Sequence, residues 1–397
     1  MKTGRPGNAD GAKKAKTGKI ILFAVEIVVL AVLVVGLWLV FRATGASGDE
    51  SGDGTTSISN GGVLKLSIDE KELEQTFNEE VKENETLKGY RNIALFGVDS
   101  REGQLAQKTR TDTIMIASIN EENKEVKLVS VYRDTYLNQM GNTEAYGKCN
   151  ASYAYGGAEQ SIKMLNANLD MDITDFITIG FSGLTDVIDA LGGVKVEVDS
   201  EEIKHINNYQ IEMVSKGVAP KYTAVTETGN LTLNGLQATA YCRIRYTAGN
   251  DFKRTERQRE VLKATLEKAK TASPTDLAKI CNNVFSEVYT SLDLTEILEL
   301  LSEVASYNIV DEAGFPTEGQ ITTGTIGSKG SCVIPLDLES NVKWLHEFLF
   351  DDNDYSPSEN VKKYSSQIYN ETHPYLTGAT TIKDTNAYTD DSTDDGE

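Results

Sequence analysis

The spacing of apolar and polar positions in the middle of the chain predicts alternating strands and helices. Short apolar runs at 92–98, 113–119 and 126–132 fit buried strands, and the polar turn 120–124 joins the last two. Beyond them the pattern predicts helices at 158–169 and 184–191 and strands at 176–181 and 194–198. Elements in this order favour an α/β fold with three layers, in which helices cover both faces of a central mixed sheet.

One apolar run is long enough to cross a membrane. Residues 20–41 are apolar except for Glu26 and Gly36, and a helix of this length spans roughly 33 Å. Residues 1–19 hold six lysines and arginines against one acid, Asp10, which favours the cytoplasmic side. We therefore predict a single-pass cell-membrane protein with a cytoplasmic N-terminus and an extracellular remainder. A cleaved signal peptide is the alternative, but the run is longer than a signal peptide's and lacks a clear cleavage site.

Composition divides the rest of the chain into three parts. Residues 42–88 begin with a stretch rich in glycine, serine, threonine and aspartate, typical of a flexible stalk, followed by a helical neck over 65–87. Residues 89–350 are predicted to form one catalytic domain. Residues 351–397 are acidic and poor in aliphatic side chains, so we predict a disordered tail.

The net charge of −21 makes nucleic acid an unlikely partner and makes local groups of arginines conspicuous. Four such groups pair a base with a polar or acidic residue at strand ends: 99–101, 110–112, 133–134 and 148–150. A fifth spans 241–246, where Arg243 and Arg245 would face one way if the segment is a strand. A helix is predicted over 251–270 after it. The side of this helix that faces the protein begins with the polar residues Asp251, Arg254 and Gln258.

Together these groups predict a phosphate site. Any single pair is readily explained as a surface or structural salt bridge, but the whole set gathers arginines and aspartates at several element ends. Arginine forks match phosphate oxygens, and carboxylates beside them suit Mg²⁺. Such a site promotes phosphoryl transfer by positioning and charge neutralisation. We therefore expect these side chains to converge on one pocket.

The cysteines and histidines carry little chemistry of their own. All four cysteines lie after the predicted membrane helix and show no metal-binding spacing. If the groups at 148–150 and 241–246 share a pocket, Cys149 and Cys242 can form a disulfide, and Cys281 and Cys332 pair by default. Four buried free thiols are the alternative, and a catalytic thiol is a weaker one. The three histidines are too few for a histidine-based catalytic centre, and we assign them no role.

The motifs at 97–101, 110–113, 130–135, 148–151, 243–246 and 251–258 resemble those of the LytR-CpsA-Psr family of cell-wall glycopolymer ligases. The resemblance covers about residues 90–270. It implies a transferase that takes a glycopolymer from an undecaprenyl-pyrophosphate carrier and joins it through a phosphodiester to peptidoglycan, at the 6-hydroxyl of N-acetylmuramic acid.

The resemblance also implies roles for individual residues. Asp99 and Asp112 would bind Mg²⁺, and the pyrophosphate would be held by Arg110, Arg133, Arg243, Arg245, Arg254 and Gln258. Arg133, Asp134, Lys148 and Asp251 would act in catalysis, with Asp251 or Asp134 as the base. Because a polyprenyl tail must be sheltered from water, we expect an apolar groove lined by 176–181 and 184–191. Two other functions fit the same residues: hydrolysis of a polyprenyl pyrophosphate, and regulation by a non-catalytic protein that binds a lipid phosphate.

Overall fold

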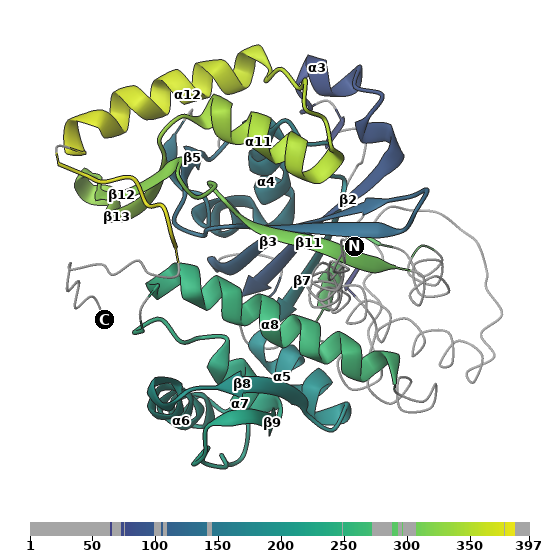
Figure 1. The fold of residues 1–397 in the computed structure, drawn as a ribbon, viewed down its shortest axis with the longest axis vertical. Helices are drawn as coiled ribbons and strands as arrows, with labels where there is room; N and C mark the ends of the chain where they lie inside the picture. The colour runs from purple at the N-terminus through teal and green to yellow at the C-terminus, as the bar shows by residue number, and fades with distance from the viewer. Residues whose placement is uncertain are drawn as a thin grey trace, which may run out of the picture.

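The computed structural model describes residues 64–65, 73–74, 76–98, 105, 109–140, 145–247, 249–271, 288–292, 296, 307–376 and 378–385. These contain a seven-stranded sheet in the order β1-β10-β7-β2-β3-β4-β11 (Figure 1). The strands are β1 (Leu64–Lys65), β10 (Val288–Thr290), β7 (Asp175–Gly180), β2 (Tyr90–Val98), β3 (Thr111–Asn120), β4 (Glu125–Val131) and β11 (Asn308–Phe315). Because β2 runs parallel to β7 but antiparallel to β3, the predicted mixed sheet is confirmed.

Three helices cover one face of this sheet: α4 (Ala151–Leu169), α11 (Leu338–Phe350) and α12 (Glu359–Thr372) (Figure 1). Apolar strand residues such as Phe96 and Ile116 point toward this layer and pack against Ile162, Leu165 and Leu345 in one buried cluster. Burial of so much apolar surface is the main favourable contribution to folding. This face therefore holds the main core.

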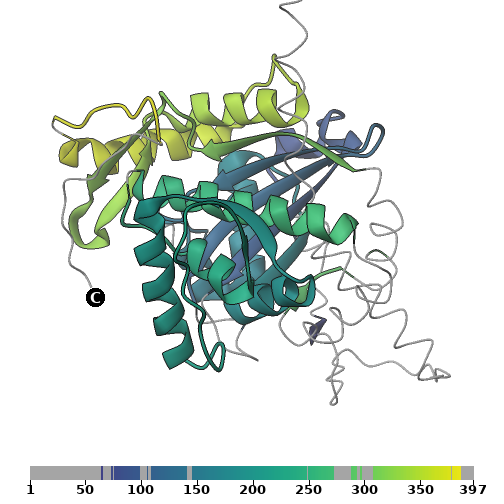
Figure 2. The same ribbon diagram turned by 60° about the horizontal axis from the view of Figure 1, so that its bottom comes forward.

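The opposite face is covered by α5 (Phe181–Ala190) and α8 (Asn250–Lys270), with a smaller unit beyond them. That unit consists of β8 (Val194–Val198), α6 (Ser200–Ser215), β9 (Gly229–Leu233) and α7 (Gly235–Tyr241), and Figure 2 brings it forward with the sheet behind. Its antiparallel strands and its helices share a separate apolar cluster that includes Val196, Ile206 and Leu236. The small unit thus has a core of its own.

The C-terminal region differs from its prediction. Residues 351–397 were expected to be disordered, yet α12 is regular and buries Val361, Tyr364 and Ile368 against the main core. Ser358 caps its first turn by accepting a hydrogen bond from the amide of Val361. These apolar positions are spaced like one face of a helix, and their burial stabilises it despite the polar composition. Residues 386–397 lie outside the described part.

The N-terminal predictions are only partly covered by the structure. The membrane span predicted at 20–41 lies outside the described residues, and among those that are described no helix is both long and apolar enough to cross a bilayer. The helical neck predicted at 65–87 is helical only in pieces among the described residues. Leu64–Lys65 pairs with β10 in the sheet, and helical residues occur at 73–74, in α3 (Glu79–Lys82) and in η1 (Leu87–Gly89).

Two further hairpins flank the domain. One consists of β5 (Tyr136–Asn138) and β6 (Tyr146–Lys148), and the other of β12 (Ile321–Thr325) and β13 (Ser331–Pro335), whose turn contains η3 (Gly327–Lys329). An isolated bridge between Thr135 and Val333 connects β13 to the segment that follows β4. The chain after α12 forms η4 (His373–Tyr375).

Candidate functional site

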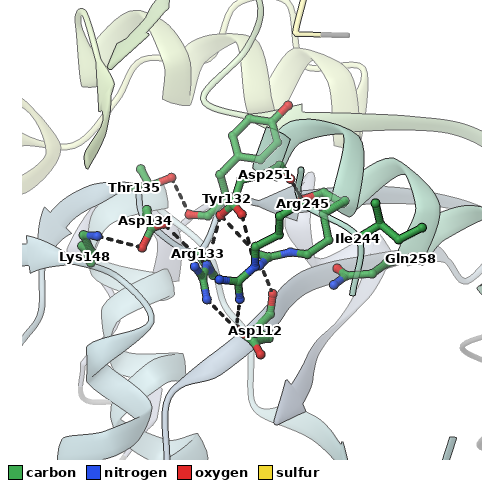
Figure 3. Close-up of polar contacts among 12 residues, drawn as sticks. Asp112, Tyr132, Arg133, Asp134, Thr135, Lys148, Ile244, Arg245, Asp251 and Gln258 are labelled. Carbon is green, nitrogen blue, oxygen red and sulfur yellow. Dashed lines mark hydrogen bonds and ion pairs between the residues drawn. The ribbon is translucent and has the colours of Figure 1, made fainter. Parts of the chain in front are cut away.

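Two aspartates and three arginines form a compact ion cluster between the sheet and α8 (Figure 3). Nη1 of Arg133 lies 2.6 Å from Oδ1 of Asp112, and its Nε lies 3.0 Å from Oδ2 of Asp251. Arg245 reaches the same two carboxylates, at 3.3 Å from Asp112 and 3.8 Å from Asp251. Arg254 lies 3.1 Å from Asp251. The structure therefore brings these five predicted residues together.

The cluster forms because several elements end at the same place. Asp112 is the second residue of β3, and Arg133 comes just after β4, so the antiparallel pairing of these strands puts both at one end. Asp251 and Arg254 share a face of the first turns of α8, since they are three residues apart. Arg245 arrives from the loop after α7.

The strand predicted over 241–246 is wrong. Asn234 and Gln237 form a capping box that starts α7, and this helix continues to Tyr241 before a turn and loop. Arg243 and Arg245 consequently point to different partners. Arg243 pairs with Glu212 at 3.1 Å rather than joining the cluster.

Asp134 and Lys148 form a second polar pair beside the cluster. Nζ of Lys148 lies 3.4 Å from Oδ1 of Asp134, and Nε of Arg133 lies 3.5 Å from its Oδ2 (Figure 3). The backbone carbonyl of Asp134 accepts a hydrogen bond from the amide of Val333 in β13 at 2.9 Å. The β12–β13 hairpin therefore fixes the backbone that carries this aspartate.

The arginines keep both carboxylates of the cluster ionised. Burial alone would raise the pKa of Asp251, but Arg254, Arg133 and Arg245 outweigh it and hold that pKa well below its usual range. The pKa of Asp112 is lowered by the same guanidiniums against the effect of burial. Burial lowers the pKa of Arg254 to about 10, and Arg133 and Arg245 act in the same direction. Arg254 thus stays charged at neutral pH in a place that favours a further anion.

Arg254 is buried more deeply than the other arginines of the cluster, with 3% of its side chain exposed. Its Nε and Nη1 atoms find no hydrogen-bond partner among the described residues. One turn along α8, Oε1 of Gln258 is likewise buried and unpartnered within the described part of the chain. Buried donors without acceptors cost free energy unless a ligand satisfies them. These atoms therefore mark a ligand position.

An apolar cavity opens next to these atoms, between the sheet and the helices α5 and α8. The space in it that water-sized molecules can reach is about 100 Å³, within a total empty volume of about 750 Å³ that includes open solvent at its mouth. Its lining comprises Leu95, Phe96, Gly97, Thr113, Met115, Ile177, Ile179, Gly180, Phe181, Leu184, Cys242, Gln258, Val261 and Leu262. Of the predicted lining segments, 176–181 contributes its later residues and 184–191 contributes Leu184. Gln258 belongs to both the cavity and the polar site.

Of three other predicted site residues, two lie outside the cluster and one lies outside the described residues. Arg110 is exposed just before β3, and no ion pair connects it to another described residue. Arg243 lies at the rim of the cavity, where its guanidinium is 5.4 Å from the ring centre of Phe181. Asp99 lies outside the described residues, so its predicted role as a Mg²⁺ ligand stays a prediction.

The predicted disulfide between Cys149 and Cys242 is wrong. Both are free and buried, as is Cys332, while Cys281 lies outside the described residues. Cys149 packs in the main core, whereas Cys242 belongs to the core of the small unit. The thiols do not meet, because Arg243 pairs with Glu212 outside the cluster and the two cysteines pack in separate cores. Burial raises the pKa of Cys332 to about 11, which disfavours a reactive thiolate.

Sequence reasoning missed most of the cavity lining. Leu95 and Met115 lie on the sheet face opposite to that of Phe96 and Ile116, and they border the cavity. That Leu95 and Met115 share a face was predictable from the sequence, because every second side chain of a strand lies on the same side of the sheet. Both faces of this sheet are covered, so both carry apolar side chains. The sequence alone gave no indication that this face is incompletely filled.

The described residues offer one direct candidate for Mg²⁺, Asp112. Both of its ion pairs use Oδ1, and a carboxylate has a second oxygen with which to contact a cation. In the described part of the chain no group of three or more histidine, cysteine, aspartate or glutamate side chains could hold a metal ion. The residues therefore fit Mg²⁺ that keeps water or phosphate oxygens as its other ligands.

Fold and site together define an α/β protein with an arginine-rich pocket at the mouth of an apolar cavity, an arrangement suited to an amphiphilic anion. The chain belongs to the LytR-CpsA-Psr family, since the LytR_cpsA_psr family model matches residues 61–331. The resemblance seen in the motifs is thereby confirmed.

The chain is also similar to individual proteins of known name. It is 33% identical over 195 residues to the polyisoprenyl-teichoic acid–peptidoglycan teichoic acid transferase TagT of Bacillus subtilis, covering 49% of this chain and 57% of that protein. It is 34% identical over 213 residues to TagU of Halalkalibacterium halodurans, covering 53% and 64%. The chain thus spans less than two thirds of either relative. A solved structure described as TagT bound to LI-WTA matches with a TM-score of 0.53 at 25% identity, covering 70% of this chain and 97% of that one.

Proposed function

We propose that this chain is a transferase that moves a glycopolymer from an undecaprenyl-pyrophosphate carrier to peptidoglycan. The observation that carries the proposal is Arg254, a buried guanidinium whose Nε and Nη1 have no partner among the described residues, next to an apolar cavity. A polyprenyl pyrophosphate has the two parts that this arrangement suits. Family membership and the printed names of the relatives support transfer to peptidoglycan.

Binding would divide the carrier between the two parts of the site. The tail would enter the cavity, where each CH₂ group removed from water contributes about 0.8 kcal/mol. The pyrophosphate would accept hydrogen bonds from Arg254 and from Arg133 and Arg245, which already lie within 4 Å of the Asp112 and Asp251 carboxylates. Arginine forks suit such a group because they donate two parallel hydrogen bonds.

Transfer requires the acceptor hydroxyl to lose a proton and attack phosphorus. The acceptor is proposed to be the 6-hydroxyl of N-acetylmuramic acid, which forms a bond to the phosphorus that carries the glycopolymer. The bond from this phosphorus to the bridging oxygen breaks, and polyprenyl phosphate leaves. The arginines and Lys148 would stabilise the developing negative charge.

Asp134 is the better placed base of the two aspartates considered. Three arginines hold the pKa of Asp251 well below its usual range, which makes it a weak base. Asp134 contacts Lys148 and only the Nε edge of Arg133. Replacing Asp134 with Asn should slow transfer about 100-fold or more with little change in lipid affinity. A wild-type rate in this variant would exclude Asp134 as the base.

Mg²⁺ is proposed to bind at Asp112 together with Asp99. When bound, it would neutralise charge on the pyrophosphate oxygens. Isothermal titration of the protein with MgCl₂, in the presence of polyprenyl pyrophosphate, tests this assignment. Asp112→Asn should weaken Mg²⁺ binding at least tenfold, and an unchanged isotherm would remove Asp112 from the metal site.

The chain is further proposed to sit in the cell membrane through residues 20–41, with its catalytic domain outside. This proposal rests on the apolar run and on the basic residues before it. A membrane anchor would keep the domain near its lipid substrate and raise the effective concentration. Protease added to intact cells should digest the domain; full protection would contradict the orientation.

Product analysis separates this function from its alternatives. Full-length protein in detergent would be incubated with a polyprenyl-pyrophosphate-linked glycan and purified peptidoglycan, and the products analysed by mass spectrometry. The proposal predicts glycan joined to muramic acid through a phosphodiester. Free glycan phosphate alone would indicate a hydrolase, and bound lipid without turnover would indicate a non-catalytic binding protein. Either result would contradict transfer.

A further inference from the structure

A row of aromatic side chains extends outward from the rim of the cavity. Phe181 lines the cavity, and the guanidinium of Arg243 lies 5.4 Å from its ring centre. The same guanidinium lies 5.0 Å from the ring centre of Tyr209 on α6. Arg243 thus contacts both a ring that lines the cavity and a ring that does not.

The helix α6 presents a continuous polar and aromatic face at this point. His205, Tyr209 and Glu212 are spaced by four and three residues, so they lie on one side of the helix. Glu212 fixes Arg243 through an ion pair of 3.1 Å. The charges of Arg245 and Arg243 both act on the pKa of Tyr209, although burial raises it overall. This face of α6 therefore borders the arginines of the site.

Tyr246 is the outermost aromatic residue of the row. It directly follows Arg245, whose guanidinium contacts Asp112, and 74% of its surface is exposed. Its ring centre lies 6.3 Å from that of His205, with the ring planes inclined by 33°. An aromatic ring this exposed contributes little to the stability of the fold, because it removes little apolar surface from water. Its position beside the site points instead to a ligand.

From the cavity outward, the side chains therefore change from apolar to cationic and then to aromatic. The proposed donor has the same order along its length: an apolar tail, a pyrophosphate and a sugar. Aromatic rings stack on the C–H faces of pyranose rings through dispersion contacts, while nearby hydroxyl, imidazole and carboxylate groups hydrogen-bond sugar hydroxyls.

We propose that Tyr246, His205 and Tyr209 form a subsite for the pyranose that is linked to the donor pyrophosphate, with Tyr246 as its stacking platform. This subsite rests on the proposed function, because it requires a lipid pyrophosphate that carries a sugar. It makes Tyr246 a determinant of which glycolipid the protein accepts. It also gives His205, to which the sequence suggested no role, a position beside the sugar.

The test compares two lipids and two exposed tyrosines. Full-length protein in detergent micelles is titrated with octaprenyl pyrophosphate and with the same lipid carrying one N-acetylglucosamine. Tyr246→Ala should weaken binding of the sugar-bearing lipid about five- to tenfold and leave octaprenyl pyrophosphate unchanged. Tyr246→Phe keeps the ring and should bind both lipids like the wild type. Tyr369→Ala is the matched control, because Tyr369 is 54% exposed and stacks on His373 on the opposite layer.

Several outcomes would overturn the subsite. Equal binding of both lipids by Tyr246→Ala and wild type, or an equal loss for both lipids, would remove the sugar contact. A higher KM for peptidoglycan with unchanged donor affinity would assign Tyr246 to the acceptor and contradict the donor subsite. Failure of the wild type to bind either lipid would instead contradict the proposed function itself, and is thereby distinguished from failure of the subsite.

Discussion

The two faces of the central sheet differ in how completely they are filled. Toward α4, α11 and α12 the strands bury their side chains in a continuous core that includes Phe96, Ile162 and Leu345. Toward α5 and α8 the same strands border an apolar cavity that reaches Gln258, beside the cluster of ionised side chains. One face therefore supplies most of the stability, and the other gives up packing to make room for a ligand. Substitutions on the two faces should consequently have different effects.

The largest expected effect is a loss of transfer activity, and it distinguishes Arg254 from Arg257, two buried arginines of α8. Arg254 lies in the proposed binding pocket, whereas Arg257 lies 2.7 Å from Glu202 in a buried pair that joins α8 to α6 of the small unit. Arg254→Ala should reduce transfer at least 100-fold, because it removes charge stabilisation worth several kcal/mol. Arg257→Ala should instead lower the free energy of unfolding by about 3–5 kcal/mol, since it leaves Glu202 buried and unpaired.

Transfer rates and urea unfolding of the two variants measure both effects. Arg254→Lys is a useful control, because it keeps the charge but loses the planar fork, and should restore only part of the activity. If Arg254→Ala were fully active while folded, the phosphate site would have to lie elsewhere. A stable Arg257→Ala protein would show that the Glu202 pair is dispensable.

The next prediction compares isoleucines on the two faces. Ile162 is fully buried in the main core, while Ile179 is partly exposed and borders the cavity. Ile162→Ala should lower the free energy of unfolding by about 2–5 kcal/mol, because it creates a new void. Ile179→Ala enlarges the existing cavity and should lower the free energy of unfolding by less than about 2 kcal/mol. Urea unfolding measures both, and equal losses would mean that the cavity closes in solution.

The last expected effect is absent at neutral pH and develops only on acidification. His346 is buried in the main core, where its ring stacks on Tyr355 and burial lowers its pKa to about 4. Below pH 6.5 His346 binds a proton in the unfolded chain but stays neutral in the folded protein. The contribution of His346 to stability is therefore fully present above pH 6.5 and is lost as the pH falls toward 4. The loss attributable to His346 should reach about 3 kcal/mol.

Unfolding measured between pH 7 and 4 for the wild type and His346→Gln isolates this contribution. The variant should lack the histidine-dependent part of the decline. His373→Gln serves as a control for replacing a histidine outside the core, since His373 is exposed. Parallel profiles for the wild type and His346→Gln would contradict the prediction. The ionised cluster around Asp251 should respond only at lower pH, because its carboxylate pKa lies well below the usual range.

The sequence predicted those parts of the molecule that depend on local pattern. The strands around 92–98, 113–119 and 126–132 were predictable because their apolar runs are short and bounded by turns. The positions of Asp112, Arg133 and Asp251 near one another followed from strand and helix ends. The start of α8 was also predictable, because its polar stripe had to face partners.

The remaining features depend on tertiary contacts. Composition suggested disorder where α12 forms, because only Val361, Tyr364 and Ile368 supply apolar side chains to its buried face. Alternating arginines suggested a strand where α7 ends and a loop begins. Cys149 and Cys242 were expected to pair, yet they belong to cores on opposite sides of the sheet. Which sheet face is left partly unfilled depends on how α5 and α8 are placed by the small unit.

The central claim is that the cavity binds a polyprenyl tail while Arg254 and its neighbours bind the pyrophosphate. The most direct measurement is the affinity of the full-length protein, and of Arg254→Ala, for octaprenyl pyrophosphate, octaprenyl phosphate and octaprenol in the same detergent. For the wild type, affinity should rise at least tenfold with each added phosphate, because each brings further charge to the guanidiniums. In Arg254→Ala the gain in affinity with each added phosphate should largely disappear, while the affinity for octaprenol should stay that of the wild type. Equal affinity of the wild type for all three lipids would contradict the claim.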